Sequence, residues 1–342
     1  MNKKIVKLTP TELDFAVTWM LHKRCNNDCM YCGEEHHNDS SSVLTLEELK
    51  SYWIQIFEKT KHVELPYVIA FTGGEPIINK DFKPFVAWLD KNYSPYIKKI
   101  GVTTNGSGSK KYYLELFKHL TFMTISTHSE SFSFDFERFC ETIIACNQYA
   151  ASTPGKIFFV NIMEEYWAVD LIKKLIDVCQ ENNIKFSLNA IGWNRRGARS
   201  YPILIQNRTK IHKTELTVSP EIVNLAHKEI QDYVQLYSIP KDEHYNVEVE
   251  YDDGSSIKTF ATRLNFLDLN YFKDWECYAG YHRISINDDS SVYVGECKGQ
   301  FLGKLSDSSF KLLDGPCTCS RIRCTGNPMD LMLAKSIKNK VS

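Results

Sequence analysis

The chain has 342 residues, and at about 150 residues per domain this length predicts two domains, or one large domain with an appendage. The 41 Lys and Arg residues nearly balance the 42 Asp and Glu residues, which leaves a formal charge of -1 at pH 7. The net charge therefore indicates no nucleic-acid partner. No apolar run approaches the ~18 residues of a membrane span, so we expect no membrane partner.

The eleven cysteines are the most informative part of the composition. The chain begins with polar and charged residues, without the apolar stretch of a signal peptide, so we expect a cytoplasmic protein. In that reducing compartment, an odd number of clustered thiols indicates metal binding or catalysis rather than a disulfide framework.

Six strand patterns alternate with amphipathic helical patterns in the first 190 residues, which is typical of a parallel α/β sheet. Six units are too few for a closed eight-fold barrel, so the pattern predicts a partial (β/α)6 TIM-like barrel. The predicted strands are 16–21, 67–71, 97–103, 122–127, 156–162 and 184–189. The predicted helices are 46–59, 81–91, 110–119, 135–149 and 166–182, and the first has a capping box of Thr45 and Glu48.

The alternation stops after residue 191. A basic loop at 192–199 precedes a predicted helix at 220–237 and a hairpin of 246–251 with 256–261. A second predicted hairpin joins 281–286 to 292–294 between two cysteines, and the last dozen residues resemble a polar helical tail. We therefore expect domains at 1–195 and 271–342, and a connecting, substrate-specificity segment at 196–270.

The first cysteine group is a C-x3-C-x2-C loop of Cys25, Cys29 and Cys32, which begins just after the first predicted strand. Three thiolates on one short loop can face a single metal centre and leave one coordination position open. A zinc site with His36 or His37 as fourth ligand is the alternative. The other cysteines of the barrel, Cys140, Cys146 and Cys179, lie on predicted helices and are expected to be packed as small apolar residues.

Three further polar motifs follow the next three predicted strands. By itself each is as compatible with an ordinary turn as with a ligand site. Ligand sites of parallel α/β proteins form at the carboxyl ends of the strands, so we expect these motifs to converge on one face with the cysteine loop. The motifs are Thr72-Gly73-Gly74-Glu75-Pro76, Thr103-Thr104-Asn105-Gly106 and Ser126-Thr127-His128-Ser129.

The cysteine loop, with Tyr31 at its aromatic position, and the Gly73-Gly74-Glu75-Pro76 motif resemble the radical S-adenosylmethionine (SAM) superfamily. The resemblance covers about residues 12 to 195 and implies a [4Fe-4S] cluster whose open iron binds SAM. It implies that Gly73, Gly74 and Glu75 bind the SAM amino group and that Tyr31 lies near adenine. Further implied SAM contacts are Asn105, Ser126, Asn161 or Ile162, and Ala190.

The last five cysteines resemble the Twitch or SPASM auxiliary-cluster domains that follow many radical SAM barrels. Five thiols suit one auxiliary [4Fe-4S] cluster rather than two. Cys277 and Cys297 are the first expected ligands, and two more come from Cys317, Cys319 and Cys324. A structural zinc site is the alternative, because four thiolates also suit zinc.

Two features remain weaker candidates for the site. Arg195, Arg196 and Arg199 form a basic loop that is either solvated or able to bind an anionic group of SAM or substrate. His128 is a candidate pocket residue or proton donor.

The resemblance implies reductive cleavage of SAM to a 5'-deoxyadenosyl radical, which abstracts a substrate hydrogen. The expected partners are a reductant such as flavodoxin or ferredoxin and a small-molecule substrate: a sugar, cyclitol or nucleotide. With about 15 residues before the first predicted strand, we expect no leader-binding domain for a peptide. The alternatives are a peptide- or protein-modifying maturase, and a non-catalytic zinc or iron-sulfur scaffold or electron carrier.

Overall fold

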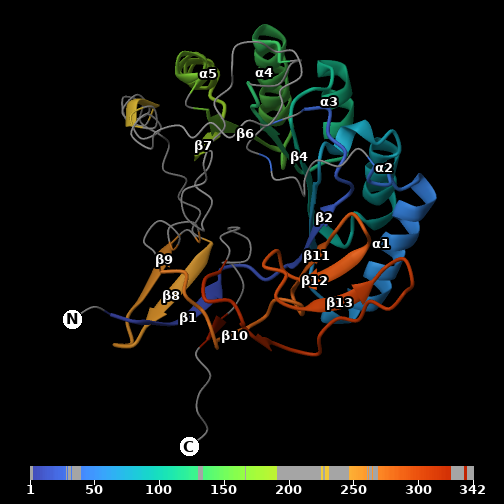
Figure 1. Cartoon of the computed structure of the whole chain (residues 1–342), viewed down its shortest axis with the longest axis vertical. Coiled ribbons are helices and arrows are strands. Elements are labelled where there is room, and N and C mark those ends of the chain that lie inside the picture. The colour runs from blue at the N-terminus through green and yellow to red at the C-terminus, as the bar shows by residue number, and fades with distance from the viewer. Residues whose placement is uncertain are drawn as a thin grey trace, which may run out of the picture.

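The computed structural model describes residues 3–27, 29, 32, 40–129, 134–165, 167–190, 225, 228–230, 246–259, 261, 264, 269–324 and 335–336. These residues form two sheets, and helices cover one face of the larger sheet (Figure 1). Within the predicted helix at 220–237 the structure describes residues 225 and 228–230, which are helical, whereas the basic loop at 192–199 lies outside the described residues.

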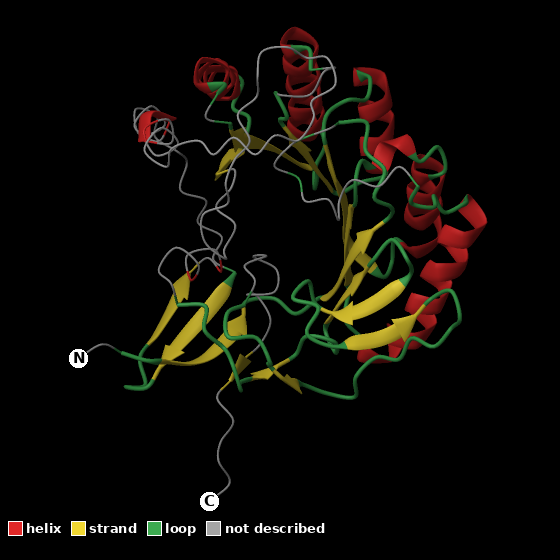
Figure 2. Cartoon of the chain, in the orientation of Figure 1, coloured by secondary structure: helices red, strands yellow, loops and turns green. Residues whose placement is uncertain are grey.

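The larger sheet contains all six predicted strands, side by side and parallel in chain order, which confirms the partial barrel. The sheet is curved (Figure 2), and because these strands are parallel their carboxyl ends lie along one edge. The strands are β2 (Phe15–Met20), β3 (Tyr67–Thr72), β4 (Ile97–Thr104), β5 (Phe122–Ser126), β6 (Ile157–Glu164) and β7 (Phe186–Ala190).

The five predicted barrel helices are confirmed and lie on the outer side of this sheet (Figure 2). The first begins with the predicted capping box, in which Glu48 N donates to Thr45 Oγ1 and Thr45 N donates to the Glu48 carboxylate. The helices are α1 (Leu46–Thr60), α2 (Phe82–Tyr93), α3 (Lys110–Phe117), α4 (Phe136–Ser152) and α5 (Val169–Glu181), with 3-10 turns η2 (Lys61–Val63) and η3 (Pro76–Ile78).

The main core lies between the sheet and these helices. Trp19 of β2 illustrates it: its ring is buried and meets Phe85 of α2 edge to face, 5.7 Å between ring centroids. Cys140, Cys146 and Cys179 are buried in this core, as predicted. Side chains alternate along a strand, so the strand residues next to those in the core point to the opposite, inner face of the sheet.

The predicted hairpin at 281–294 is confirmed as β11 (Arg283–Ile286) and β12 (Ser291–Val294), followed by β13 (Phe301–Lys304). It extends the barrel sheet, because β11 pairs in parallel with β2 and aligns Ile286 with Trp19. The predicted segments 1–195 and 271–342 therefore share one continuous sheet.

The smaller sheet has the order β14-β10-β15-β1-β8-β9. It contains the predicted hairpin near 246–261 and a strand at the start of the chain that the pattern did not predict. The prediction of a helical tail is wrong at Lys335–Ser336, which pair as a strand with β1 and β10. The strands are β1 (Ile5–Pro10), β8 (Val247–Tyr251), β9 (Ser256–Thr259), β10 (Glu276–Cys277), β14 (Cys317–Thr318) and β15 (Lys335–Ser336).

The sequence pattern placed the first strand about 15 residues into the chain, but strand β1 precedes it. Its hydrogen bonds go to β8 and β15, which follow it by more than two hundred residues, so its formation depends on tertiary pairing.

Among the described helices, none is both long and apolar enough to cross a membrane.

Candidate functional site

The glycine motif after β3 lies directly against the segment that leads into the cysteine loop. The parallel pairing of β2 with β3 continues past both strands, because Gly74 N donates to His22 O at 2.7 Å and Glu75 N donates to Arg24 O at 2.8 Å. Cys25 follows immediately. The motif therefore holds the start of the cysteine loop at the carboxyl edge of the sheet.

Glycine is needed here because no side chain fits between the two backbones. A Cβ on Gly74 would lie 2.0 Å from Arg24 O, and a Cβ on Gly73 would lie 2.5 Å from His22 O. Gly73 also has φ +152, a conformation that other residues rarely adopt. Both glycines are therefore required by the close approach of two protein segments.

Glu75 lies entirely inside the protein, with an exposed fraction of 0%. Its carboxylate accepts hydrogen bonds from Thr104 Oγ1 at 2.6 Å and from Asn105 N at 2.6 Å. Burial raises its pKa to about 7, although these donors oppose the shift. Glu75 thus joins the motif after β3 to the motif after β4. Because its carboxylate is occupied in this way, the groups of the glycine motif that could face a ligand are backbone groups.

Asn105 links this network to the first cysteine. Its side-chain amide nitrogen lies 3.7 Å from Cys25 Sγ and donates to Asn26 Oδ1 at 2.9 Å. Asn27 N also donates to Cys25 Sγ, at 3.4 Å. Burial nevertheless raises the pKa of the Cys25 thiol above its usual value, so iron binding must be accompanied by release of its proton.

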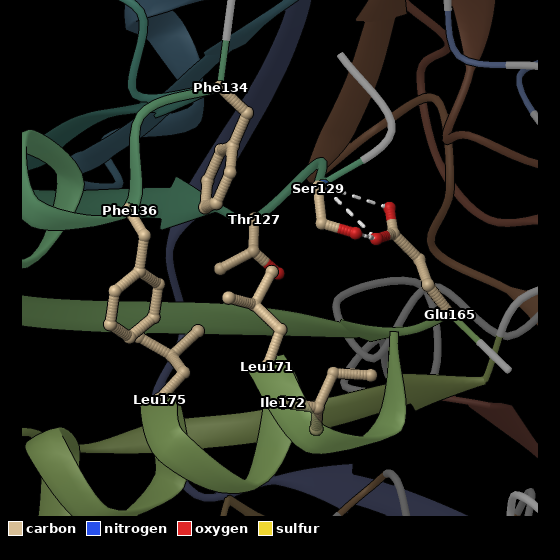
Figure 3. Close-up of a pocket in the computed structure, with 8 residues that line it drawn as sticks. All are labelled: Thr127, Ser129, Phe134, Phe136, Glu165, Leu171, Ile172 and Leu175. Carbon is tan, nitrogen blue, oxygen red and sulfur yellow. Dashed lines mark hydrogen bonds between the residues drawn. The ribbon is translucent and has the colours of Figure 1, made fainter. Parts of the chain in front are cut away.

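His128, after β5, reaches the second cysteine. Its Nδ1 lies 3.4 Å from Cys29 Sγ, and the donor of this hydrogen bond depends on the histidine tautomer. The neighbouring Ser129 donates from its backbone N–H and its hydroxyl to the carboxylate of Glu165, which follows β6. Figure 3 shows the two side chains pointing toward each other at the rim of a small, largely apolar pocket against α5. Glu165 thereby holds the loop that carries His128.

A row of uncharged polar side chains crosses the inner face of the last three barrel strands. Asn189 donates to Ser187 Oγ at 3.3 Å, and Ser187 donates to Asn161 Oδ1 at 3.0 Å. Asn161 in turn donates to Ser126 Oγ at 3.4 Å. The sequence predicted Asn161 and Ser126 as site residues and missed Ser187 and Asn189, whose polar alternation along β7 was the available signal.

Comparisons with known proteins identify this arrangement. Residues 19–151 match the Radical SAM superfamily, and they include the cysteine loop and the motifs after β3, β4 and β5. This segment of the chain is similar to the radical SAM superfamily.

Two relatives are similar to the chain over short stretches. A probable GTP 3',8-cyclase of Methanocella arvoryzae is 36% identical over 87 residues, which is 25% of each chain. An S-adenosylmethionine-dependent nucleotide dehydratase of Selenomonas ruminantium is 33% identical over 96 residues, 27% of this chain and 30% of that protein. The matches thus span less than a third of the length of these relatives.

The fold is also similar to that of a solved structure, native anSMEcpe with bound AdoMet. The TM-score is 0.52 at 14% identity, over 87% of this chain and 80% of that chain. At this identity the similarity concerns the fold alone.

The match to the radical SAM superfamily implies a [4Fe-4S] cluster and SAM, and the cysteine loop is chemically suited to them. Cys25 and Cys29 lie beside polar groups that can donate to a thiolate. His22, three residues before Cys25, is fully buried, and within the described part of the chain its ring nitrogens have no hydrogen-bond partner. Among the described residues no three His, Cys, Asp or Glu side chains are grouped as a metal site, so the set Cys25, Cys29 and Cys32 stays a prediction.

Four of the five C-terminal cysteines pack against the main core, although no three of them are grouped as a metal site among the described residues. Cys277 lies directly opposite Cys317 in the β10–β14 pair, and pairing continues where Cys319 N donates to Trp275 O at 2.8 Å. Cys319 follows β14 directly and continues its pairing, so its side chain is expected on the same face as that of Cys317. Cys297 joins them, because Arg321 donates to its carbonyl oxygen at 2.9 Å.

Cys324 lies in a different environment. It is buried in the second core with Leu8 and Phe272, and its backbone exchanges hydrogen bonds with Asn270. Cys319 also contacts this second core, at the boundary between the two.

Three predicted site residues cannot be placed. Tyr31 and Arg196, with Arg195 and Arg199, lie outside the described residues. Ala190 ends β7, but its side chain is also outside the described part.

Proposed function

We propose that the chain cleaves SAM reductively and abstracts a hydrogen atom from a small polar molecule such as a nucleotide, sugar or cyclitol. The observation that carries this proposal is the assembly of the cysteine loop, the Gly73-Gly74-Glu75 backbone, Asn105 and His128 at the carboxyl edge of a curved parallel sheet. That edge is where ligand sites of this architecture form.

When bound, the reduced cluster and SAM supply the 5'-deoxyadenosyl radical that removes the substrate hydrogen. The chain's own residues bind and orient these groups. Cys25, Cys29 and Cys32 would hold three irons, Asn105 and His128 would donate toward two of the sulfur atoms, and the backbone of Gly73 and Gly74 would face the SAM amino group. Tyr31 and Ala190 are proposed neighbours of adenine, and Arg196 a contact for an anionic group.

The inner face of the sheet supports a small polar substrate over a bulky apolar one. Beside Asn161 and Ser126, which are implied contacts of SAM, Ser187 and Asn189 present a hydroxyl and an amide, which suit the hydroxyl groups of a ribose, another sugar or a cyclitol. Two relatives carry names that specify nucleotide substrates, GTP 3',8-cyclase and nucleotide dehydratase. These two observations are the support for proposing a small-molecule substrate.

We further propose one auxiliary [4Fe-4S] cluster held by Cys277, Cys297, Cys317 and Cys319. The packing of these four cysteines against the main core supports this choice, and the separate packing of Cys324 makes it the fifth, non-ligating thiol. Such a cluster would exchange an electron with the product or contact the substrate. A flavodoxin or ferredoxin would reduce the SAM-binding cluster.

The first experiment tests the chemistry. Full-length protein, reconstituted anaerobically with iron and sulfide and then reduced, should form 5'-deoxyadenosine from SAM, measured by liquid chromatography with mass spectrometry. Cys29→Ala should abolish this product, whereas Cys179→Ala, a change in the helix core, should retain it. Failure of fully loaded protein to form 5'-deoxyadenosine would favour an electron carrier or scaffold.

The second experiment tests the substrate class. Nucleotides, sugars, cyclitols and peptides are added separately, and the rate of 5'-deoxyadenosine formation is compared with the rate without substrate. A deuterated compound that transfers deuterium into 5'-deoxyadenosine is a substrate. Transfer from a peptide alone would replace the small-molecule proposal with the peptide-modifying alternative.

A further inference from the structure

The two ends of the cysteine loop meet at the tip of the C-terminal hairpin. Ser41 Oγ accepts from Lys23 N at 3.2 Å and donates to Asp288 Oδ2 at 3.1 Å. Lys23 Nζ lies 3.3 Å from Asp288 Oδ1. Arg24 Nε adds a hydrogen bond of 2.6 Å to Ser41 O. The carboxylate of Asp288 therefore contacts both sides of the segment that carries all three cysteines.

The sheet register explains why this hairpin turn reaches the loop. Strands β11 and β2 are parallel, and Ile286 is aligned with Trp19 near the end of each. The turn after β11 therefore leaves the sheet at the edge from which the cysteine loop starts. The Asp288 side chain keeps 13% of its exposure and that of Lys23 keeps 31%, so this ion pair is partly shielded from water.

We propose that Asp288 is a positioning residue for the SAM-binding cluster, which it serves by closing the cysteine loop through Ser41 and Lys23. The inference rests on the proposed assignment of the cluster to Cys25, Cys29 and Cys32. Fixing residues 23 and 41 against the hairpin restricts the conformations of the chain between them before iron binds. The thiols then need less ordering when the cluster forms, which slows its loss.

The chain offers a matched control in the same turn. The Asp289 carboxylate accepts from Ser291 N at 3.1 Å and from Ser291 Oγ at 2.9 Å, and its other partner is Lys304 at 3.7 Å. These contacts go to β12 and β13 and not to the segment that carries the cysteines. Asp288→Asn and Asp289→Asn make the same change in charge and shape one residue apart.

The first measurement uses the full chain without iron and needs no activity. Hydrogen exchange of the Lys23 amide, which donates to Ser41, should become about tenfold faster in Asp288→Asn and in Ser41→Ala. Ser41→Thr, which keeps the hydroxyl, should restore slow exchange. Asp289→Asn should match the unchanged protein at this amide.

The second measurement uses reconstituted protein. Iron release to a chelator from the cluster whose electron paramagnetic resonance spectrum changes on addition of SAM should be about tenfold faster in Asp288→Asn than in Asp289→Asn. Equal exchange and equal iron release in the two variants would overturn the positioning role. Faster exchange in a protein whose cysteine loop binds no cluster would keep the contact but refute the proposed function, so the two failures are distinguishable.

Discussion

Thr104 donates a hydrogen bond of 2.6 Å to Glu75, and both residues are buried between the ends of β3 and β4. The buried Glu75 carboxyl connects the loops that follow β3 and β4 at this edge of the sheet. Its contacts connect the glycine motif to Asn105 and, through Asn105, to Cys25.

The raised pKa of Glu75 predicts a pH-dependent stability. The usual value is 4.5 and burial raises it to about 7, so between these values the folded protein holds a proton that the unfolded chain releases. The free energy of unfolding of the iron-free protein should therefore fall by about 1–3 kcal/mol as the pH rises through this window. Denaturant unfolding at several pH values measures this fall, and Glu75→Gln should remove it. An equal fall in both proteins would contradict the prediction.

Gly74→Ala should destabilise the chain and disturb the cysteine loop. The new Cβ would meet Arg24 O at 2.0 Å, so one of two paired backbones must move. We expect a loss of about 2–3 kcal/mol in the free energy of unfolding, measured by denaturation. Gly155→Ala is the control, because Gly155 has φ +80 but no atom within 4 Å of the added Cβ, and it should cost only about 1–2 kcal/mol.

His128→Ala should make the reduction potential of the SAM-binding cluster more negative. An N–H group directed at a ligating sulfur favours the reduced, more negatively charged cluster, and His128 is 3.4 Å from Cys29 Sγ. A redox titration followed by electron paramagnetic resonance measures the change. His119→Ala, which removes a histidine paired with Asp90 at 2.9 Å, should leave the potential unchanged. A potential that does not move in His128→Ala would refute the contact.

Cys319→Ser should remove about half of the iron of the fully reconstituted protein, because it would lose the auxiliary cluster and keep the other. Cys324→Ser should retain all of it, since Cys324 packs in the second core beside Leu8. Iron and sulfide analysis distinguishes the two variants. The reverse result would assign Cys324 as a ligand and Cys319 as the spare thiol.

Arg283→Met should weaken the attachment of the C-terminal hairpin to the barrel. Arg283 is 1% exposed and lies 2.7 Å from Glu296, with Thr18 of β2 at 2.9 Å. Removing the cation leaves the Glu296 carboxylate without it in a partly buried position, so we expect a loss of about 3 kcal/mol. Breaking the exposed pair of Lys7 and Glu250 by Lys7→Met should cost less than about 1 kcal/mol. Equal losses in thermal or denaturant unfolding would contradict this assignment.

The sequence by itself determined the parts that depend on local pattern. Alternating apolar positions predicted β2 to β7 and the helices between them, because strand and helix periods differ. The short spacing of Cys25, Cys29 and Cys32, and the position of Gly73, Asn105 and His128 after successive strands, predicted one shared site. These positions come together because consecutive parallel strands lie side by side and end at the same edge of the sheet.

Only the tertiary structure decided the contacts between distant segments. Asp288 forms an ion pair with Lys23, and Arg283 donates a hydrogen bond to Thr18, because β11 pairs with β2. No local sequence pattern specifies that β11 and β2 are neighbours. Strand β1 and the two-residue strand β15 exist through the same kind of pairing. The hydrogen bonds of the Glu75 carboxylate to Thr104 and Asn105 were also visible only in the fold. The family resemblance had implied that Glu75 binds the SAM amino group.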